Sequence, residues 1–206
     1  MRESKASAAS YGVLICTTII KKGAAFLIEM QLFFRKEIMM RKQLSLLGKS
    51  QYDASISPNY RNSACGPTTV HVVLNYLEDQ APSVNELYKL LGGTKIGLFK
   101  WRLIRNLRRL RPTWDIRDCT LKEAMQEIDA GRPVAIRFDR YFSLNWRDKK
   151  SAFAYHWVPL IGYEIRNDEL LLLFHDNGGR DRESKIRTAP FKDNKKVLSF
   201  VKITPN

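Results

Sequence analysis

The spacing of apolar residues along the chain changes from helical to strand-like near residue 134. Four helices are expected: one that begins at Cys65–Pro67, one that follows Ser83, one from Leu98 to Leu110 and one that follows Thr120. The second and fourth begin with a capping box, a Ser or Thr followed three residues later by Glu. Four strands are expected at Val134–Phe138, Tyr155–Ile165, Leu170–Phe174 and Val197–Ile203, with Asn167-Asp168 as a hairpin turn. This order predicts an α+β fold, in which N-terminal helices pack on one side of a C-terminal antiparallel β-sheet.

The first 49 residues have a different pattern. Two apolar runs, 11–20 and 23–34, are separated by Lys21-Lys22, and each is shorter than the roughly 20 residues that span a membrane. We therefore divide the chain into an N-terminal extension, residues 1–49, helical or partly disordered, and a domain at 50–206. The extension would pack on the domain or on a partner, or would lie on a membrane surface with its basic side chains outward. Two alternatives are a secretion signal, although the lysine pair occupies the place of a cleavage site, and a start of synthesis at Met39 or Met40.

Charge and cysteine content narrow the classes of function. The chain has 35 Lys and Arg against 21 Asp and Glu, a formal net charge of +14, which would attract nucleic acid, an anionic membrane or an acidic partner. Its cysteines are Cys16, Cys65 and Cys119, an odd count without the spacing of a disulfide framework or a zinc site. We therefore expect a reduced, thiol-using protein without a metal or organic cofactor, and cytoplasmic rather than secreted.

One of these cysteines lies where a helix is predicted to begin. In the segment Ser63–Val70, Pro67 suits the first helical turn, so Cys65 is placed at the start of the helix. Unpaired backbone N–H groups and the positive end of the helix dipole favour an anion there, and hence the thiolate. Such a nucleophile also needs a base and a group that orients the base.

His156 and Asp176 are candidates for these two roles. His156 lies near the start of the strand at 155–165, and Asp176 directly follows the strand at 170–174. If these strands pair as antiparallel neighbours, both residues lie at the same edge of the sheet. An imidazole there could take the thiol proton, and a carboxylate could fix its tautomer and stabilise its charged form.

At this point the chain resembles a known family. Four segments are similar to the successive motifs of the C39-like cysteine peptidases, which have a papain-like fold: Gln51, Ala64–Thr69, Tyr155–Tyr163 and Phe174–Asp176. The resemblance covers about residues 50–203 and leaves the N-terminal extension unexplained. It implies a C39-like peptidase domain at 50–206 that acts on a peptide or protein substrate.

The resemblance also implies roles for individual residues. Cys65 would be the nucleophile, His156 the general base and acid, and Asp176 the orienting carboxylate. Gln51 would supply the oxyanion-hole amide, together with the backbone N–H of Cys65. Family members often carry Asp-Pro at the third motif, whereas this chain has Asp176-Asn177, so Asn177 is an alternative third member.

Other interpretations use different residues. The arginine-rich helix at 100–111, with Trp101 and Trp114, could bind nucleic acid, but no nucleic-acid motif accompanies it and a solvated basic face is the favoured interpretation. The same site could instead belong to a catalytically silent protein, or to an amidase or acyltransferase, because an acyl group on Cys65 can pass to water or to an amine. Aromatic residues that either line the cleft or pack in the core are Tyr141, Trp146 and Trp157, and packing or surface roles are expected for Cys119, His71 and His175.

Overall fold

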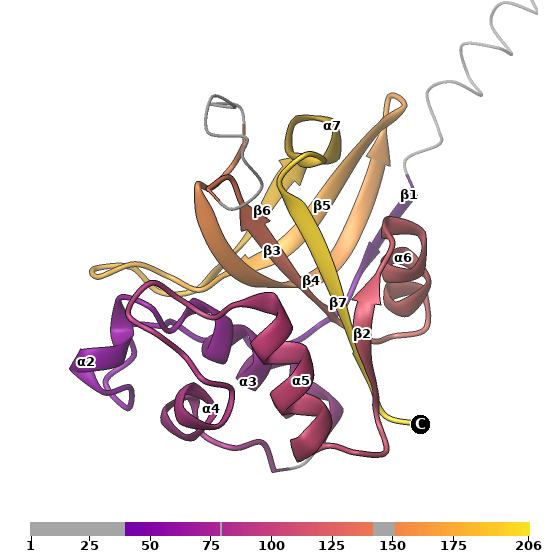
Figure 1. Cartoon of the computed structure of the whole chain (residues 1–206). Helices are drawn as coiled ribbons and strands as arrows, with labels where there is room; N and C mark the ends of the chain where they lie inside the picture. Colours follow the sequence, from indigo (N-terminus) through magenta and orange to yellow (C-terminus); the bar gives the residue numbers. More distant parts are fainter. Residues whose placement is uncertain (1–39, 79, 142–150) are drawn as a thin grey trace, which may run out of the picture. The chain divides into compact units, whose positions relative to one another are not determined.

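The computed structural model describes residues 40–78, 80–141 and 151–206, which form one compact unit that begins at Met40 (Figure 1). Its strands are β1 (Met40–Gln43), β2 (Asp115–Cys119), β3 (Val134–Asp139), β4 (Tyr155–Arg166), β5 (Glu169–Asp176), β6 (Lys185–Pro190) and β7 (Leu198–Thr204). Its helices are α2 (Pro58–Arg61), α3 (Cys65–Leu77), α4 (Val84–Leu90), α5 (Lys100–Leu110), α6 (Leu121–Asp129) and α7 (Phe191–Asn194). Within these described residues, none of the helices is long and apolar enough to cross a membrane.

The strands of the described unit form a seven-stranded antiparallel sheet. Six of them follow the order β2-β7-β3-β4-β5-β6, and β1 pairs with β4 beside this path. The long strand β4 pairs with β3 through its first half, with β5 through its second half, and with β1 at Gly162–Ile165. The α+β fold expected from the sequence is therefore confirmed, and β4 is the strand on which the sheet is centred.

Helices cover both faces of this sheet. Ala135 of β3 and Trp157 of β4 pack in a cluster with residues of α3, α4 and α5. The neighbouring residues Ile136 and Val158 point to the other face, where they pack with Ala124 and other residues of α6. The expectation that the helices gather on one side holds for α3 to α5 and is wrong for α6, because successive side chains of a strand bury into opposite faces.

Local sequence signals account for the element boundaries. Both capping boxes are present: the Ser83 hydroxyl accepts from the Glu86 N–H, and the Thr120 hydroxyl accepts from the Glu123 N–H. Asn167 and Asp168, with φ angles of 51° and 60°, form the tight turn between β4 and β5. The four expected helices and four expected strands are all observed, with ends that differ by a few residues.

Residues 40–49, which the sequence analysis placed in the N-terminal extension, take part in this fold. They supply β1, and the Leu44 N–H donates to the Ile161 carbonyl at 2.7 Å. The Leu44 side chain is buried in the cluster beneath α6. The division of the chain at residue 50 stays a prediction, and residues 1–39 lie outside the described residues.

Candidate active site

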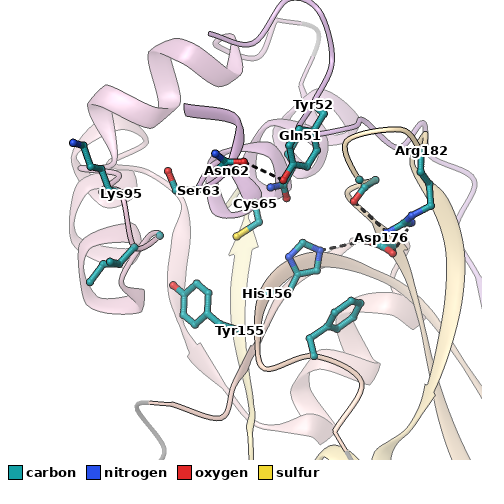
Figure 2. Close-up of a pocket in the computed structure, with 15 residues that line it drawn as sticks. Gln51, Tyr52, Asn62, Ser63, Cys65, Lys95, Tyr155, His156, Asp176 and Arg182 are labelled. Atoms are coloured by element: carbon teal, nitrogen blue, oxygen red, sulfur yellow. Dashed lines mark hydrogen bonds and ion pairs between the residues drawn. The ribbon is translucent and has the colours of Figure 1, made fainter. Parts of the chain in front are cut away.

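A cleft of about 320 Å³ contains the residues singled out from the sequence. It lies where the start of α3 meets the ends of β4 and β5 (Figure 2). It is lined by Gln51, Tyr52, Asn62, Ser63, Cys65, Lys95, Ile96, Gly97, Phe153, Tyr155, His156, Asp176, Gly178, Gly179 and Arg182. Cys65, His156, Asp176 and Gln51 are therefore brought together from segments as far apart as residues 51 and 176.

Cys65 is the first residue of α3, as the sequence predicts. Its side chain is 6% exposed and reaches the cleft, so the sulfur is accessible from one side only. The Thr69 hydroxyl donates to the Cys65 carbonyl at 2.8 Å, which fixes the first turn. The thiol thus sits at the N-terminal end of a 13-residue helix, where free N–H groups favour negative charge.

His156, the second residue of β4, lies between Cys65 and Asp176 (Figure 2). Its Nε2 is 3.3 Å from Asp176 Oδ1, which leaves Nδ1 for the thiol. Burial alone would lower the pKa of His156, but hydrogen bonds with Asp176 and Cys65 raise that pKa to about 9. The imidazole is therefore positively charged at neutral pH and can stabilise a neighbouring thiolate.

Asp176 ends β5 and is 1% exposed. Its Oδ2 accepts from Arg182 at 2.8 Å and from Arg187 at 3.0 Å. Burial would raise the pKa of Asp176, but hydrogen bonds from His156, Arg187 and Arg182 hold it well below its ordinary value. The two arginines therefore occupy one oxygen of an ionised carboxylate and leave the other oxygen for His156.

Phe153 and Arg187 also hold the imidazole in place. The Arg187 guanidinium lies 5.1 Å from the centre of the Phe153 ring, and the Phe153 ring lies 4.7 Å from the His156 ring. Arg187 thus contacts both Asp176 and Phe153, and each of these contacts His156. The orientation of the imidazole is fixed by an ion pair on one side and ring packing on the other.

Gln51 is held at the cleft through its backbone and its side chain. Its N–H donates to the Asn177 carbonyl at 2.8 Å, and its Nε2 donates to the Arg61 carbonyl at 2.8 Å. Its Oε1 is buried and has no hydrogen-bond partner among the described residues. Because Nε2 carries two hydrogens, one N–H remains for a further acceptor.

Asn177, the alternative third member, lies in a different place. Its Nδ2 is 3.0 Å from the Cys65 carbonyl, 3.0 Å from Thr69 Oγ1 and 2.9 Å from the Trp157 carbonyl. The side chain thus links the first turn of α3 to β4. The structure brings Asp176, rather than Asn177, to the imidazole.

The other candidates that the structure describes do not line the catalytic cleft. Trp157 is fully buried in the core and donates its Nε1–H to the Leu98 carbonyl at 2.9 Å. Tyr141 is not among the residues that line the cleft. Trp146 lies outside the described residues. Burial, and then the charge of Glu123, raise the pKa of Cys119 to about 12, so this thiol stays protonated. His71 contacts the Pro82 carbonyl at 2.9 Å and His175 contacts Ser184 Oγ at 3.2 Å.

Some residues of the site were not expected from the sequence. These are Arg182, Arg187, Phe153 and the turn at 94–97. A buried carboxylate needs cationic partners, which is a usable signal, but the chain has 35 Lys and Arg to choose from. In the described part of the chain, no group of three or more His, Cys, Asp and Glu side chains is arranged to hold a metal ion.

Comparisons with known proteins point to one family. The model of the peptidase C39-like family matches residues 43–204. Among solved structures, the chain is similar to the peptidase domain of Streptococcus ComA, a bifunctional ABC transporter involved in a quorum-sensing pathway. The identity is 14%, the TM-score is 0.49, and the match covers 80% of this chain and 98% of that one. A comparison with curated protein sequences gives no match.

Proposed function

Because the chain belongs to the peptidase C39-like family, we propose that it is a cysteine peptidase that hydrolyses a peptide or related amide bond through Cys65, His156 and Asp176. Membership of the family bears out the resemblance drawn from the sequence motifs and the papain-like fold that it implied. One observation carries the proposal: a thiol at a helix start faces an imidazole whose other nitrogen contacts a buried, ionised carboxylate. The peptidase domain would be the unit at residues 50–206, extended by β1.

In the first half of the reaction, the Cys65 thiolate attacks the carbonyl carbon of the scissile bond and forms a tetrahedral intermediate. The negative oxygen would receive hydrogen bonds from the backbone N–H of Cys65 and the remaining N–H of Gln51 Nε2. The His156 imidazolium then gives its proton to the leaving amine as the C–N bond breaks. A thioester between Cys65 and the acyl part of the substrate remains.

In the second half, neutral His156 takes a proton from water, and the resulting hydroxide attacks the thioester. The C–S bond breaks, the carboxylic acid leaves, and the proton on His156 restores the ion pair with the Cys65 thiolate. Asp176 does not change protonation; it orients the imidazole and stabilises its charged form. An amine in place of water would make the same site an acyltransferase.

The proposal is tested by incubating the full chain with a pool of synthetic peptides and identifying the products by mass spectrometry. We expect cleavage, and after acid quench a protein mass increased by the acyl part of a substrate, mapped to Cys65. Cys65→Ala should lower the cleavage rate by at least about 10³-fold, because no thioester can form. Cys119→Ala is the matched control and should cleave at the rate of the unchanged chain.

The acceptor is identified in the same experiment by adding an amine. Hydrolysis is supported if the acyl part of the substrate is released as a carboxylic acid. Acyl transfer is supported if it is released mainly as an amide of the added amine. Cleavage that persists in Cys65→Ala would contradict the proposed nucleophile.

A further inference from the structure

The turn from Thr94 to Gly97 presents two exposed side chains at one end of the cleft. The Thr94 N–H donates to the Gly97 carbonyl at 3.0 Å, and the Gly97 N–H donates back to the Thr94 carbonyl at 2.9 Å. Between these residues, Lys95 and Ile96 are both exposed, Ile96 at 65%, and both line the cleft. An apolar side chain and a cation are thus displayed by one turn in the same cleft as the candidate nucleophile.

This turn is anchored to the strand that carries His156. Gly97 has a φ of +114°, and a Cβ there would lie 2.6 Å from the Tyr155 ring, so the backbone packs directly on that ring. The next residue, Leu98, accepts hydrogen bonds at its carbonyl from the Tyr155 hydroxyl and the Trp157 indole, each at 2.9 Å. The turn is therefore a fixed rim of the cleft, and its two side chains are displayed from a defined backbone.

Lys95 also borders a second cavity, of about 550 Å³. This cavity is lined by Asn59, Tyr60, Tyr88, Gly93, Thr94 and Lys95. The Tyr60 and Tyr88 rings are stacked with their centres 4.0 Å apart. The Tyr88 hydroxyl is 2.8 Å from Ser63 Oγ, and Ser63 lines the catalytic cleft. The two hollows thus adjoin at Lys95 and Ser63.

The charges around these hollows are unbalanced. Among the described residues that line them, Asp176 is the one carboxylate, and it already contacts His156, Arg182 and Arg187. Asp181 and Glu183 flank Arg182 in sequence but do not line either hollow. Lys95 forms no ion pair with any described residue, and Figure 2 shows it at the end of the cleft away from Arg182. A peptide that passes over the turn meets a positive charge that has no counterion among the described residues.

We propose that the turn at 94–97 selects the substrate, and that the preferred substrate is a peptide with an acidic side chain that contacts Lys95, beyond the residues bound next to Cys65. The chain beyond that acidic residue would lie over the stacked tyrosines. This inference rests on the proposed function, since it names the class of peptide that the same cleft takes. The net charge of +14 acts in the same direction, because it attracts acidic peptides at long range.

The test is a pair of peptides that are identical except for Glu or Gln at one position. To choose this position, cleavage sites are first mapped in a peptide pool. The position, counted from the cleaved bond, is the one at which acidic residues are most enriched. We expect the Glu peptide to have a kcat/KM about 1.5-fold to fivefold higher, which corresponds to the roughly 0.2–1 kcal/mol that one exposed ion pair contributes. In Lys95→Glu the Gln peptide should become the better substrate, whereas Lys122→Glu on α6 has the same charge change and should keep the preference for Glu.

Binding of the two peptides to the Cys65→Ala chain, measured by fluorescence anisotropy, separates recognition from catalysis. If the Glu peptide binds more tightly and this difference is lost in Cys65→Ala/Lys95→Glu, the inference is supported. If the unchanged chain cleaves neither peptide, hydrolysis is overturned, but the binding result still supports the inference. Cleavage with no acidic preference, or with a preference that survives Lys95→Glu, would overturn the inference and leave the peptidase proposal standing. Equal binding of the two peptides without cleavage of either would overturn both.

Discussion

At His156, burial and hydrogen bonding act on the charge of the imidazole in opposite directions. Burial favours the neutral ring, whereas Asp176 and Cys65 favour the charged ring and raise its pKa to about 9. Asp176 can do this because Arg182 and Arg187 keep it ionised although it is almost completely buried. The arginines thus act on the imidazole through the carboxylate and are positioning residues.

The separate roles of Asp176 and Asn177 can be distinguished by substitution. Asp176→Asn removes the charge next to the imidazole, so the pKa of His156 should fall and the acid-side reactivity of Cys65 should decrease. Asn177→Ala removes the amide group that donates to α3 and to β4 and should lower the free energy of unfolding by about 1–3 kcal/mol, with the pH profile of Cys65 alkylation unchanged.

Urea unfolding and the pH dependence of Cys65 alkylation measure the two effects separately. If Asn177→Ala displaced the pH profile and Asp176→Asn did not, Asn177 would be the orienting residue and the present assignment would be wrong.

For single residues, the sequence predicts that Cys65, His156 and Asp176 lie close together, because a helix start and the pairing of two strands determine their positions. Cys65 could be placed at a helix start from Pro67, and His156 and Asp176 at one sheet edge from the strand spacing. Arg182 and Arg187 could not be assigned, since their contact with Asp176 depends on the register of β5 with β6 and on the turn between them. No local pattern of one or two residues encodes such a contact.

At the scale of elements, β1 shows how a strand can join the sheet with little sequence signal. Its four residues are all exposed, so no apolar alternation marks it. Its pairing depends on Gly162 of β4, where a Cβ would lie 2.2 Å from the Lys42 carbonyl oxygen. A bulge between Leu160 and Gly162 accompanies this close approach.

Gly162→Ala should therefore separate β1 from β4. We expect the free energy of unfolding to fall by roughly 1–3 kcal/mol, the range for an added methylene that the surroundings cannot accommodate. Amide hydrogen exchange should become faster at residues 40–44 and stay slow in the hydrogen bonds between β3 and β7. Unchanged protection at residues 40–44 would contradict this account of the glycine.

The sequence also failed to predict β2 and β6, for a related reason. They are the two end strands of the order β2-β7-β3-β4-β5-β6, and most of their residues are partly or fully exposed. An edge strand buries few side chains, so polar and charged residues are tolerated and the alternation of apolar residues is weak. The central strands β3, β4, β5 and β7 and the capped helices α4 and α6 carry strong patterns and were predicted.

At the scale of the whole molecule, the basic surface has structural uses. On α5, Lys100 pairs with Asp118 at 2.6 Å, and the Arg108 Nε–H donates to the Ile116 carbonyl at 2.6 Å, so both connect the helix to β2. Arg111 makes two hydrogen bonds to Glu78, at 2.6 and 3.0 Å. These contacts give part of the basic surface of α5 a structural role, and the choice between a solvated basic face and a nucleic-acid module stays a prediction.

The three groups proposed for catalysis come from different parts of the fold. Cys65 starts α3 in the cluster formed with α4 and α5, whereas His156 and Asp176 lie on neighbouring strands of the sheet. The site is therefore complete only when the helices α3 to α5 are packed on the sheet. A measurement that reports the Cys65–His156 interaction tests the fold and the chemistry together.

The most direct measurement is the rate of alkylation of each cysteine by iodoacetamide as a function of pH, with peptide mapping, in the full chain and in His156→Ala. Because the raised pKa keeps His156 charged until the pH passes about 9, we predict rapid alkylation of Cys65 well below the pH of about 8.5 at which an ordinary thiol ionises. His156→Ala should lose this acid-side reactivity, and Cys119, whose pKa is raised to about 12, should stay slow throughout. If Cys65 reacts as slowly as Cys119 and is unaffected by His156→Ala, the thiolate–imidazolium pair does not form and the proposed active site is wrong.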